Sequence, residues 1–319
     1  MLTYTFVIPV KPGGSTRALQ ALREIIHPKD RYEIIIVEGT SPSCQRNTAA
    51  SQAKGDIVYF LDDDSLVAAH CLSLCDSVFS NPDVAVAGGP SLTPSTDSPL
   101  QRLFGLALTS PFGAGAVRNR YRAVGAVRDT TERELILCNL AVRRDVFLSL
   151  GGFDERLYPN EENEFLDRVQ NNRHRILHVP ELSVLRSQRR SVRSFARQMF
   201  SYGRGRAEQT LISHRLPVAS LVPAAFLVYL LLLPLVAGFH TWLWAPLCAY
   251  LLFSVLFAGI SAATSGKLSA LGLAGVFPLM HIANASGLLY GFIPRPRSHH
   301  ASPSPVVVRK VKAFEQSTF

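Results

Sequence analysis

The stretch Gly55-Asp56-Ile57-Val58-Tyr59-Phe60-Leu61-Asp62-Asp63-Asp64 decides the fold of this chain. From Asp56 to Leu61 it is an apolar run rich in β-branched and aromatic residues, which predicts a buried β-strand. Three acidic residues follow at once. In a parallel sheet covered by helices, ligands bind beyond the carboxyl ends of the strands. The stretch therefore predicts a buried strand whose end faces a ligand site.

Strand and helix patterns alternate on both sides of this stretch. We expect strands at 2–10, 33–37, 84–87 and 175–179, and helices at 16–26, 45–54, 66–80 and from Arg143 to Gly151. Such alternation predicts an α/β fold with a mostly parallel sheet covered by helices. The segment from Ser91 to Thr131 is rich in Gly, Ser, Pro and Arg, and we expect it to be a long irregular excursion.

Asp62 and Asp64 have the spacing of a metal-binding pair. At positions i and i+2 after a strand, both carboxylates can face one crevice. Mg²⁺ or Mn²⁺ typically takes one or two protein carboxylates and completes its shell with phosphate oxygens and water. Such an ion would neutralise the charge on a departing diphosphate. The alternative is a solvated turn or a helix N-cap; three consecutive acids directly after the strand favour the metal.

Two further side chains lie near the predicted strand ends. Glu38 ends the strand before the triad, where a carboxylate accepts hydrogen bonds from a ribose or a base edge, or simply serves a solvated turn. Arg46 opens the following helix and either binds diphosphate or pairs with Asp62. The residues alone leave both choices open.

The acidic stretch Glu161-Glu162-Asn163-Glu164 is a candidate for general base catalysis. When a group is transferred to a hydroxyl, that acceptor hydroxyl attacks the group and must lose its proton. A carboxylate within hydrogen-bond reach of the hydroxyl can take that proton. Taken alone, the stretch equally suits a solvated helix start after Asn160, because acids are favoured in the first turn. Another pair, Cys71 and Cys75, has helical spacing, but small buried apolar residues explain it better than a metal site.

The second part of the chain is apolar. Overall 47% of residues are hydrophobic and 18% are charged, and soluble domains average about 25% charged residues. Between 217 and 294 the only charged residue is Lys267. About 20 apolar residues cross a bilayer, so there is room for three spans, at 217–239, 242–264 and 268–293. No charged segment precedes the first strand, so we expect no cleaved signal peptide and a cytoplasmic first domain.

The net charge of +9 comes largely from two basic clusters that flank the apolar region. They are Arg186, Arg189, Arg190, Arg193, Arg197, Arg204, Arg206 and Arg215 before it, and Arg295, Arg297, Arg309, Lys310 and Lys312 after it. This placement is typical of cytoplasmic membrane flanks. No nucleic-acid-binding module accompanies the charge, and we expect no nucleic-acid partner. The stretch 189–209 predicts either a helix on the membrane surface or a basic face of the soluble domain.

Three full crossings would place the basic C-terminal tail outside, against the positive-inside bias. We therefore expect one segment to be re-entrant or interfacial. The last segment is the weakest span, because it contains Gly275, Pro278, His281, Asn284 and Gly287.

Together these motifs resemble family 2 of the inverting, GT-A-fold glycosyltransferases. The resemblance covers the chain from Thr3 to about Leu185 and rests on an ordered set of motifs: Phe6-Val7-Ile8-Pro9, Glu33 to Glu38, Gln45-Arg46-Asn47, Gly55 to Asp64, Arg143-Arg144, Gly151 to Glu155 and Asn160 to Glu164. The stretch from Arg197 to Arg206, with the apolar region, looks like the bacterial exopolysaccharide branch typified by succinoglycan glucosyltransferases.

The resemblance implies roles by position. Asp62 and Asp64 match the family's DxD pair, for ribose contact and for Mg²⁺ or Mn²⁺, while Pro9, Glu38, Arg46 and Asp63 fall among its donor-binding positions. Glu162 falls on the Asp of the usual Glu-Asp base motif, with Glu161 and Glu164 as the alternatives. Glu38 likewise stands where the family usually has Asp. The Gln-x-x-Arg-Trp motif of processive synthases is absent, which implies one sugar per encounter.

We therefore expect a multi-pass protein of the cytoplasmic membrane that moves a sugar from a nucleotide-sugar donor to a polyprenyl-linked glycan in cell-surface polysaccharide synthesis. Other polysaccharide-assembly proteins are expected partners. The expected parts are a nucleotide-sugar-binding half (1–105), an acceptor-binding half (106–185), a basic interfacial segment (186–216), a transmembrane region (217–294) and a basic tail (295–319). Two alternatives are an enzyme that transfers sugar directly to a polyprenyl phosphate and a non-catalytic membrane scaffold with the same fold.

Overall fold

The computed structural model describes residues 1–215, 218–236, 238, 240–293 and 305–316. They form two compact units. Of the described residues, the first unit contains 1–92, 119–186 and 305–316, and the second contains 93–118 and those between 187 and 293.

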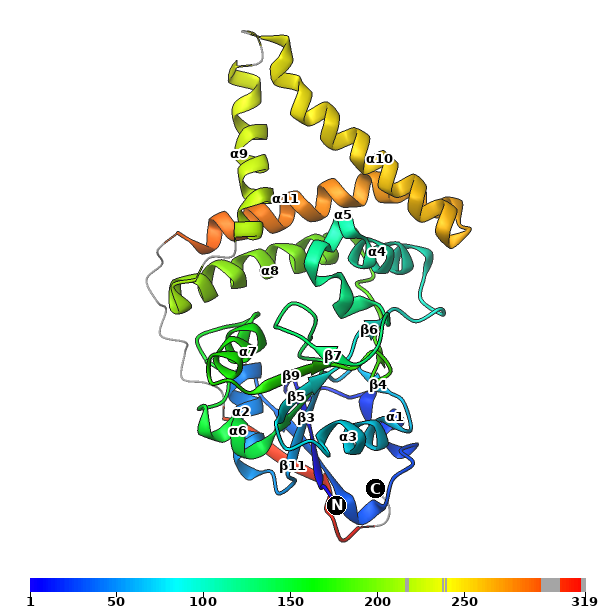
Figure 1. The fold of residues 1–319 in the computed structure, drawn as a ribbon, viewed down its shortest axis with the longest axis vertical. Helices are drawn as coiled ribbons and strands as arrows, with labels where there is room; N and C mark the ends of the chain where they lie inside the picture. The colour runs from blue at the N-terminus through cyan, green and yellow to red at the C-terminus, as the bar shows by residue number, and fades with distance from the viewer. Residues whose placement is uncertain (216–217, 237, 239, 294–304, 317–319) are drawn as a thin grey trace. The chain divides into compact units, whose positions relative to one another are not determined.

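The first unit is built on one large sheet (Figure 1). Its strands in the described residues are β1 (Tyr4–Val10), β2 (Tyr32–Glu38), β3 (Ile57–Leu61), β5 (Val84–Gly88), β7 (Arg128–Asp129), β8 (Asn139–Arg143), β9 (Arg175–His178) and β11 (Val307–Lys312), in the order β11-β2-β1-β3-β8-β5-β9-β7. β1 runs parallel to β2 and to β3, whereas β8 runs antiparallel to both β3 and β5. The expected α/β fold is confirmed, but the expectation of a mostly parallel sheet is wrong: the sheet is mixed, because β7, β8 and β11 each run antiparallel to their neighbours.

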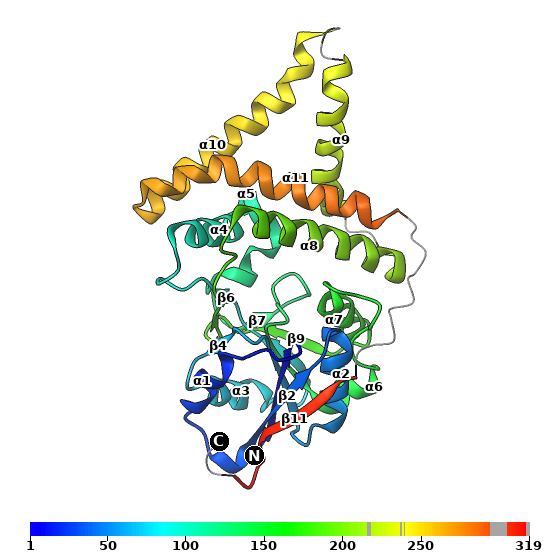
Figure 2. The same cartoon turned by 180° about the vertical axis from the view of Figure 1, so that it is seen from behind.

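Helices flank this sheet on both faces (Figures 1 and 2). They are α1 (Ala18–Arg23), α2 (Pro42–Gln52), α3 (Cys71–Phe79), α6 (Arg144–Ser149) and α7 (Glu161–Asn171), with a short 3-10 turn at Lys29–Arg31. On one face Phe60 packs between Phe147 and Phe153, with ring centroids 5.1 Å apart in both cases. Burying such rings removes a large apolar area from water, which is the dominant contribution to the stability of this unit.

A second, short sheet joins three loops of the first unit. β4 (Leu66–Val67) pairs antiparallel with β10 (Val184–Leu185), which in turn pairs parallel with β6 (Ser91–Leu92). The helix expected from Leu66 therefore begins only at Cys71, because Leu66 and Val67 are used in strand pairing. Cys71 and Cys75 are buried on α3, in agreement with an apolar role.

The C-terminal tail adds an edge strand that the sequence analysis does not anticipate. β11 pairs antiparallel with β2, with Val307 opposite Glu38 and Lys310 opposite Ile35. Val306 and Val308 pack against the apolar core of the sheet. This part of the tail is a structural element of the first unit.

The second unit is helical in its described residues. It contains α4 (Pro99–Thr109), α5 (Pro111–Ala114), α8 (Val192–Ser213), α9 (Leu221–Val236), α10 (Ala245–Ser265) and α11 (Leu273–Gly291), with 3-10 turns at Val218–Ser220, Thr241–Trp244 and Leu268–Gly272. A further 3-10 turn, Gly115–Tyr121, begins in this unit and ends in the first. The expected irregular excursion is thus wrong for α4. Ser98 and Gln101 form a capping box at its start, and Phe104 stacks on Phe195 of α8 at 4.1 Å.

Three helical stretches are long and apolar enough to cross a membrane. They are Val218–Val236, Thr241–Ser265 and Leu268–Gly291, close to the expected spans. The α8 stretch, which is equally long but rich in arginine, does not qualify.

Candidate functional site

The three acids after β3 take different environments. The backbone oxygen of Asp63 accepts hydrogen bonds from the backbone N–H groups of Arg17 (2.8 Å) and Ala18 (3.1 Å), which ties the end of β3 to the start of α1. The Asp63 side chain is exposed. Asp62 and Asp64 are only partly buried, and each contacts a guanidinium group. The loop therefore presents its first and third carboxylates to arginines.

Arg46 joins the strand-end aspartates to the acidic helix start. Its side chain is buried on α2, where one terminal nitrogen donates to Asp62 Oδ1 at 2.7 Å and the other to Glu161 Oε1 at 3.1 Å. Its Nε has no hydrogen-bond partner among the described residues. A buried cation bound by two carboxylates fixes both of them in place.

Arg186 bridges Asp62 and Asp64. Its Nε donates to Asp64 Oδ1 at 2.6 Å, and a terminal nitrogen lies 3.1 Å from Asp62 Oδ2. The short sheet explains this placement: Leu185 of β10 lies opposite Leu66 of β4, so Arg186 follows directly beside the loop that carries the aspartates. Two arginines and two aspartates thus form one cluster at the carboxyl end of β3.

The ends of β1 and β2 are held together by Gln45. Its side-chain amide donates to the backbone oxygens of Val10 (2.9 Å) and Val37 (2.6 Å). Pro9 lies in β1 opposite Val37. Glu38 accepts a hydrogen bond from the backbone N–H of Gly13 at 2.9 Å, which orders the loop after β1. These donor-site candidates lie at the carboxyl ends of parallel strands, where the sequence analysis expects a ligand.

All three glutamates at the start of α7 are largely buried. Glu161 pairs with Arg46 as described. Burial raises the pKa of Glu161, Arg46 opposes this shift, and Glu162 adds to it. Glu162 lies 3.7 Å from a terminal nitrogen of Arg120, and Arg120 also donates to the side chain of Asn163. This helix start is a charged and buried part of the site.

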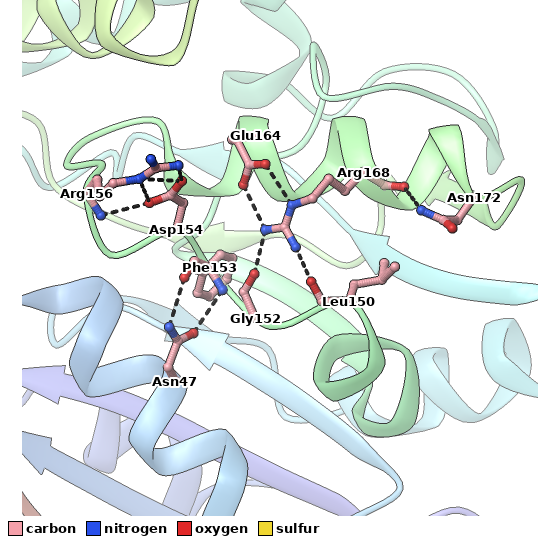
Figure 3. A network of polar contacts seen from close by, with 9 residues as sticks. All are labelled: Asn47, Leu150, Gly152, Phe153, Asp154, Arg156, Glu164, Arg168 and Asn172. Carbon is pink, nitrogen blue, oxygen red and sulfur yellow. Dashed lines mark hydrogen bonds and ion pairs between the residues drawn. The ribbon is translucent and has the colours of Figure 1, made fainter. Parts of the chain in front are cut away.

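Glu164 belongs to a different network, drawn in Figure 3. Both of its carboxylate oxygens accept hydrogen bonds from Arg168, at 2.7 Å each. Arg168 also donates to the backbone oxygens of Leu150 and Gly152. Arg168, held by Glu164, thereby links α7 to the turn after α6.

Asn47 holds the same turn from the side of α2 (Figure 3). Its amide donates to the backbone oxygen of Phe153 and accepts from the backbone N–H of Phe153, both at 2.9 Å. Gly152 has a φ of +69°, a backbone conformation that favours glycine, and a Cβ there would lie 2.6 Å from Asn47 Oδ1 and displace that side chain. The Gly151-to-Glu155 motif is thus a turn that sets the position of α7 relative to α2.

The acidic pair suits a divalent metal. Two hard carboxylate oxygens, one from Asp62 and one from Asp64, converge on the single guanidinium of Arg186. The described residues hold no group of three or more His, Cys, Asp or Glu that would form a complete protein cage. Mg²⁺ and Mn²⁺ need only one or two carboxylates when substrate phosphates and waters supply the rest. The donor set therefore fits an ion that arrives with a phosphorylated substrate.

Pro9, Glu38, Arg46, Asp62 and the helix-start glutamates are candidate site residues from the sequence, whereas Arg120 and Arg186 are not. In the sequence, Arg186 belongs to the basic cluster that precedes the apolar region. Its position directly after the short apolar run Val184-Leu185 is the feature that could have located it at a strand end. Arg120 lies in a segment expected to be irregular, where no pattern singles it out.

Comparisons with known proteins bear on the fold and on the family. Among solved structures, the fold is similar to the mannosyltransferase PcManGT from Pyrobaculum calidifontis, determined in complex with GDP-Man and Mn²⁺, with a TM-score of 0.56 and 15% identity over 92% of this chain and 88% of that chain. It also matches S. aureus TarS 1-349 in complex with UDP-GlcNAc, with a TM-score of 0.45 and 12% identity over 91% of this chain and 92% of that one. Among curated proteins, no sequence matches.

The family comparison covers more than half of the chain. The model for glycosyl transferase family group 2 matches residues 57–292, from β3 through the strand-end aspartates and the α7 glutamates to the apolar helices. The fold, the acidic strand end and this match lead to one conclusion: the chain belongs to glycosyl transferase family group 2, with a GT-A fold.

Proposed function

We propose that this protein is a membrane-bound, inverting glycosyltransferase that moves one sugar from a nucleotide-sugar donor to a polyprenyl-linked glycan. The observation that carries the proposal is the Arg46 bridge. It brings the strand-end carboxylate of Asp62 together with Glu161, directly beside the candidate base Glu162. A donor site and an acceptor site that share one buried arginine suit transfer between two substrates.

On the donor side, Asp62 and Asp64 would hold Mg²⁺ or Mn²⁺, and Arg186 lies beside them to bind phosphate oxygens. When bound, the ion would neutralise charge on the leaving diphosphate. Glu38, Pro9 and Asp63 lie at or beside the ends of β2, β1 and β3, where they would contact the nucleoside. The neighbour from Pyrobaculum calidifontis was determined with GDP-Man and Mn²⁺, which supports this type of donor and ion.

On the acceptor side, we assign the base to Glu162. Glu161 accepts a hydrogen bond from Arg46, and both oxygens of Glu164 accept hydrogen bonds from Arg168. Glu162 lies 3.7 Å from Arg120, which is beyond hydrogen-bond distance. The acceptor oxygen attacks the anomeric carbon while the bond from that carbon to the diphosphate oxygen breaks. The acceptor proton passes to Glu162, and the nucleoside diphosphate leaves with the bonding electrons. One displacement at the anomeric carbon inverts its configuration.

The apolar helices support a lipid-borne acceptor at the cytoplasmic membrane. Membrane attachment would keep the site near a polyprenyl-linked glycan and raise its effective concentration. The basic residues of α8 suit the cytoplasmic face of the membrane. The proposed role is one addition step in cell-surface polysaccharide synthesis, as in the exopolysaccharide branch that the sequence resembles, with other polysaccharide-assembly proteins as partners.

The test is sugar transfer in isolated membranes that contain the full chain. A panel of nucleotide sugars is supplied with lipid acceptors and Mn²⁺ or Mg²⁺, and then with EDTA. We expect release of one nucleoside diphosphate, its loss with EDTA, and its loss in Asp64→Ala.

The matched control is Asp129→Ala, which removes an exposed aspartate paired with Arg175 on the outermost strand. This variant should keep full transfer. If the folded wild-type chain turns over no donor, or if Asp64→Ala transfers as well as Asp129→Ala, the proposed function is wrong.

A further inference from the structure

The tail strand restricts how the chain can cross a membrane. β11 is hydrogen-bonded to β2 over the register from Val307–Glu38 to Lys312–Ile34. Lys310 Nζ forms an ion pair with the buried carboxylate of Glu33 at 2.5 Å. Lys312 is fully buried, and its Nζ donates to the backbone oxygens of Lys29 (2.5 Å) and Tyr32 (2.8 Å). A strand held this way lies on the same side of the membrane as the rest of its sheet.

The segments that lead to and from the apolar helices cannot themselves cross. Residues 187–215 carry seven arginines, and residues 294–304 carry Arg295 and Arg297 among Pro, Ser and His. Neither segment offers the run of about 20 apolar residues that a crossing needs. The start of α9 and the end of α11 are therefore on the side of the sheet, and the number of crossings among α9, α10 and α11 is even.

The C-terminal half of α11 is packed tightly along α8 (Figures 1 and 2). A Cβ on Gly203 of α8 would lie 1.9 Å from the backbone oxygen of Asn284, and a Cβ on Gly287 of α11 would lie 1.9 Å from that of Phe200. The amide of Asn284 donates to the backbone oxygen of Met199 at 3.3 Å. Small residues permit such close backbone contact. The arginines of α8 keep α8 out of the hydrocarbon core of the membrane. Because α11 is packed against α8, α11 is held at the same depth in the membrane.

The N-terminal half of α11 is also covered by protein. His281 Nε2 lies 3.0 Å from the backbone oxygen of Phe112 and 3.2 Å from that of Gly113, at α5. The ring of Phe277 meets that of Phe112 edge-on, with centroids 5.2 Å apart. Within the most apolar 18 residues of the candidate span Leu268–Gly291, which includes α11, 33% of the residues are buried inside the protein. The corresponding share is 11% for each of the other two candidate spans. α11 thus contacts other helices of its unit in both of its halves.

α9 and α10 have the opposite character. They carry many exposed large apolar side chains, Leu231, Leu232, Leu235, Leu252, Phe253 and Val255 among them. The exposed Trp242 and Trp244 lie at the turn between the two helices, and Lys267 follows the other end of α10. Aromatic rings at one end and a cation at the other are the usual membrane-interface anchors. At 1.5 Å per residue, the 21 residues of α10 span roughly 30 Å, the thickness of the hydrocarbon core.

We propose that the chain crosses the membrane twice, through α9 and α10, and that α11 lies in the lipid interface on the side of the sheet. Its free apolar side chains, such as Ile282 and Leu289, contact lipid acyl chains, continuous with the exposed surface of the α9–α10 hairpin. α8 lies beneath it on the headgroup side. This inference rests on the membrane attachment in the proposed function, but not on the reaction.

The test places single cysteines in the full-length chain and labels them with a membrane-impermeant maleimide in intact cells and in inverted membranes. The positions are Glu24→Cys in the sheet unit, His240→Cys at the α9–α10 turn, Lys267→Cys before α11 and Glu315→Cys after β11, all exposed. Labelling of the wild-type chain gives the baseline for its own five cysteines. We expect Glu24, Lys267 and Glu315 variants to react from one side and the His240 variant from the other.

Three results would overturn the proposal. The first is a Lys267 variant that is labelled from the same side as the His240 variant, or only in detergent. The others are a Glu315 variant labelled from the side opposite to the Glu24 variant, and all four variants labelled from one side. Sugar transfer is measured on the same membranes. Active protein in alkali-washed membranes with the wrong labelling pattern refutes the topology and leaves the proposed reaction intact. Protein that is removed by the alkali wash refutes the membrane attachment itself.

Discussion

Arg46 and its neighbours show how few side chains define the site. A buried guanidinium holds Asp62 and Glu161, while Arg186 holds Asp62 and Asp64. From the sequence alone, Arg46 could bind diphosphate or pair with Asp62. In this structure Arg46 pairs with Asp62. It also pairs with Glu161, a contact that the sequence does not indicate.

The assignment of the base can be tested by an equal chemical change at two glutamates. Glu162→Gln should lower the rate of transfer by at least about 100-fold, the usual contribution of a general base, while the affinity for the nucleotide sugar stays the same. Glu164→Gln should lower the melting temperature, because Arg168 loses one of its charged hydrogen bonds, while the folded protein still transfers sugar. Single-turnover rates and donor binding are measured for both variants. Loss of transfer in folded Glu164→Gln, with transfer retained in Glu162→Gln, would move the base to Glu164.

Removal of the Arg186 side chain should have opposite effects on the affinities for Mn²⁺ and for the nucleoside diphosphate. In Arg186→Ala, Mn²⁺ alone should bind about fivefold more tightly, since removal of a like charge near the carboxylates is worth about 1 kcal/mol in solvent-rich surroundings. The nucleoside diphosphate should bind more weakly, because it loses a cation. Electron paramagnetic resonance of free Mn²⁺ and a nucleotide-binding assay give the two values.

The control for that experiment is Arg156→Ala, which removes the same charge from an exposed ion pair with Asp154. It should leave Mn²⁺ binding unchanged. Equal or weaker Mn²⁺ binding in Arg186→Ala would mean that this side chain does not compete with the ion.

Because of His178, we expect the free energy of unfolding to fall in acid. It is fully buried in β9, and neither ring nitrogen has a hydrogen-bond partner among the described residues. Burial lowers its pKa, and Arg128 lowers it further. The unfolded chain therefore binds more protons once the pH falls below about 6.5, so stability that is present above this pH is lost as the pH falls.

His178→Leu should consequently lose less melting temperature between pH 7 and pH 5 than the wild type does. His70→Leu, at an exposed histidine, is the control and should keep the wild-type slope. Identical slopes in all three proteins would show that another group sets the acid response.

Among the elements, the α8–α11 pair depends on glycine. Gly287→Ala places a Cβ 1.9 Å from a backbone oxygen, which cannot be relieved by a side-chain rotation. Overpacking of this kind costs about 1–3 kcal/mol. Gly275→Ala is the matched control on the same helix, where a Cβ meets nothing within 4 Å, and it should be neutral or slightly stabilising. Thermal unfolding in detergent compares the two; equal melting temperatures would contradict the close packing.

Most elements could be predicted from sequence because their apolar patterns are long and regular. The strands up to Leu61, the helix at α8 and the three apolar helices lie close to where the patterns place them. α4 was missed because Gly, Ser and Pro dominate its surroundings, although Ser98 and Pro99 are good helix-start residues. β11 was missed because its cations suggested lipid contact, whereas Lys310 and Lys312 pair with a buried carboxylate and with backbone oxygens of the first unit.

The site was predictable only in part, because strand ends could be located but their partners could not. Asp62, Asp64 and Glu162 follow from local motifs. The bridges through Arg46 and Arg186 depend on contacts between residues far apart in the chain, such as the pairing of β4 with β10. No local pattern encodes such contacts.

At the scale of the whole molecule, the tail strand should contribute to the stability of the first unit. Lys310→Met leaves one oxygen of the buried Glu33 without its cation, which we expect to cost about 1–3 kcal/mol. Arg309→Met, at the exposed neighbour on the same strand, should have little effect. Adding Glu33→Gln to Lys310→Met should recover part of the loss. Chemical denaturation of the purified protein measures all three, and equal stabilities would show that β11 contributes no ion-pair energy.

The position of β11 also sets an order of events during synthesis. β2 leaves the ribosome early, but its outer edge stays open until β11 has been made, after all three apolar helices. At about 5–20 residues per second this interval lasts on the order of tens of seconds. An open, apolar strand edge readily pairs with other chains. Newly made protein therefore has a defined period of vulnerability to aggregation, which ends when the tail closes the sheet, and a chain that stops before β11 never leaves it.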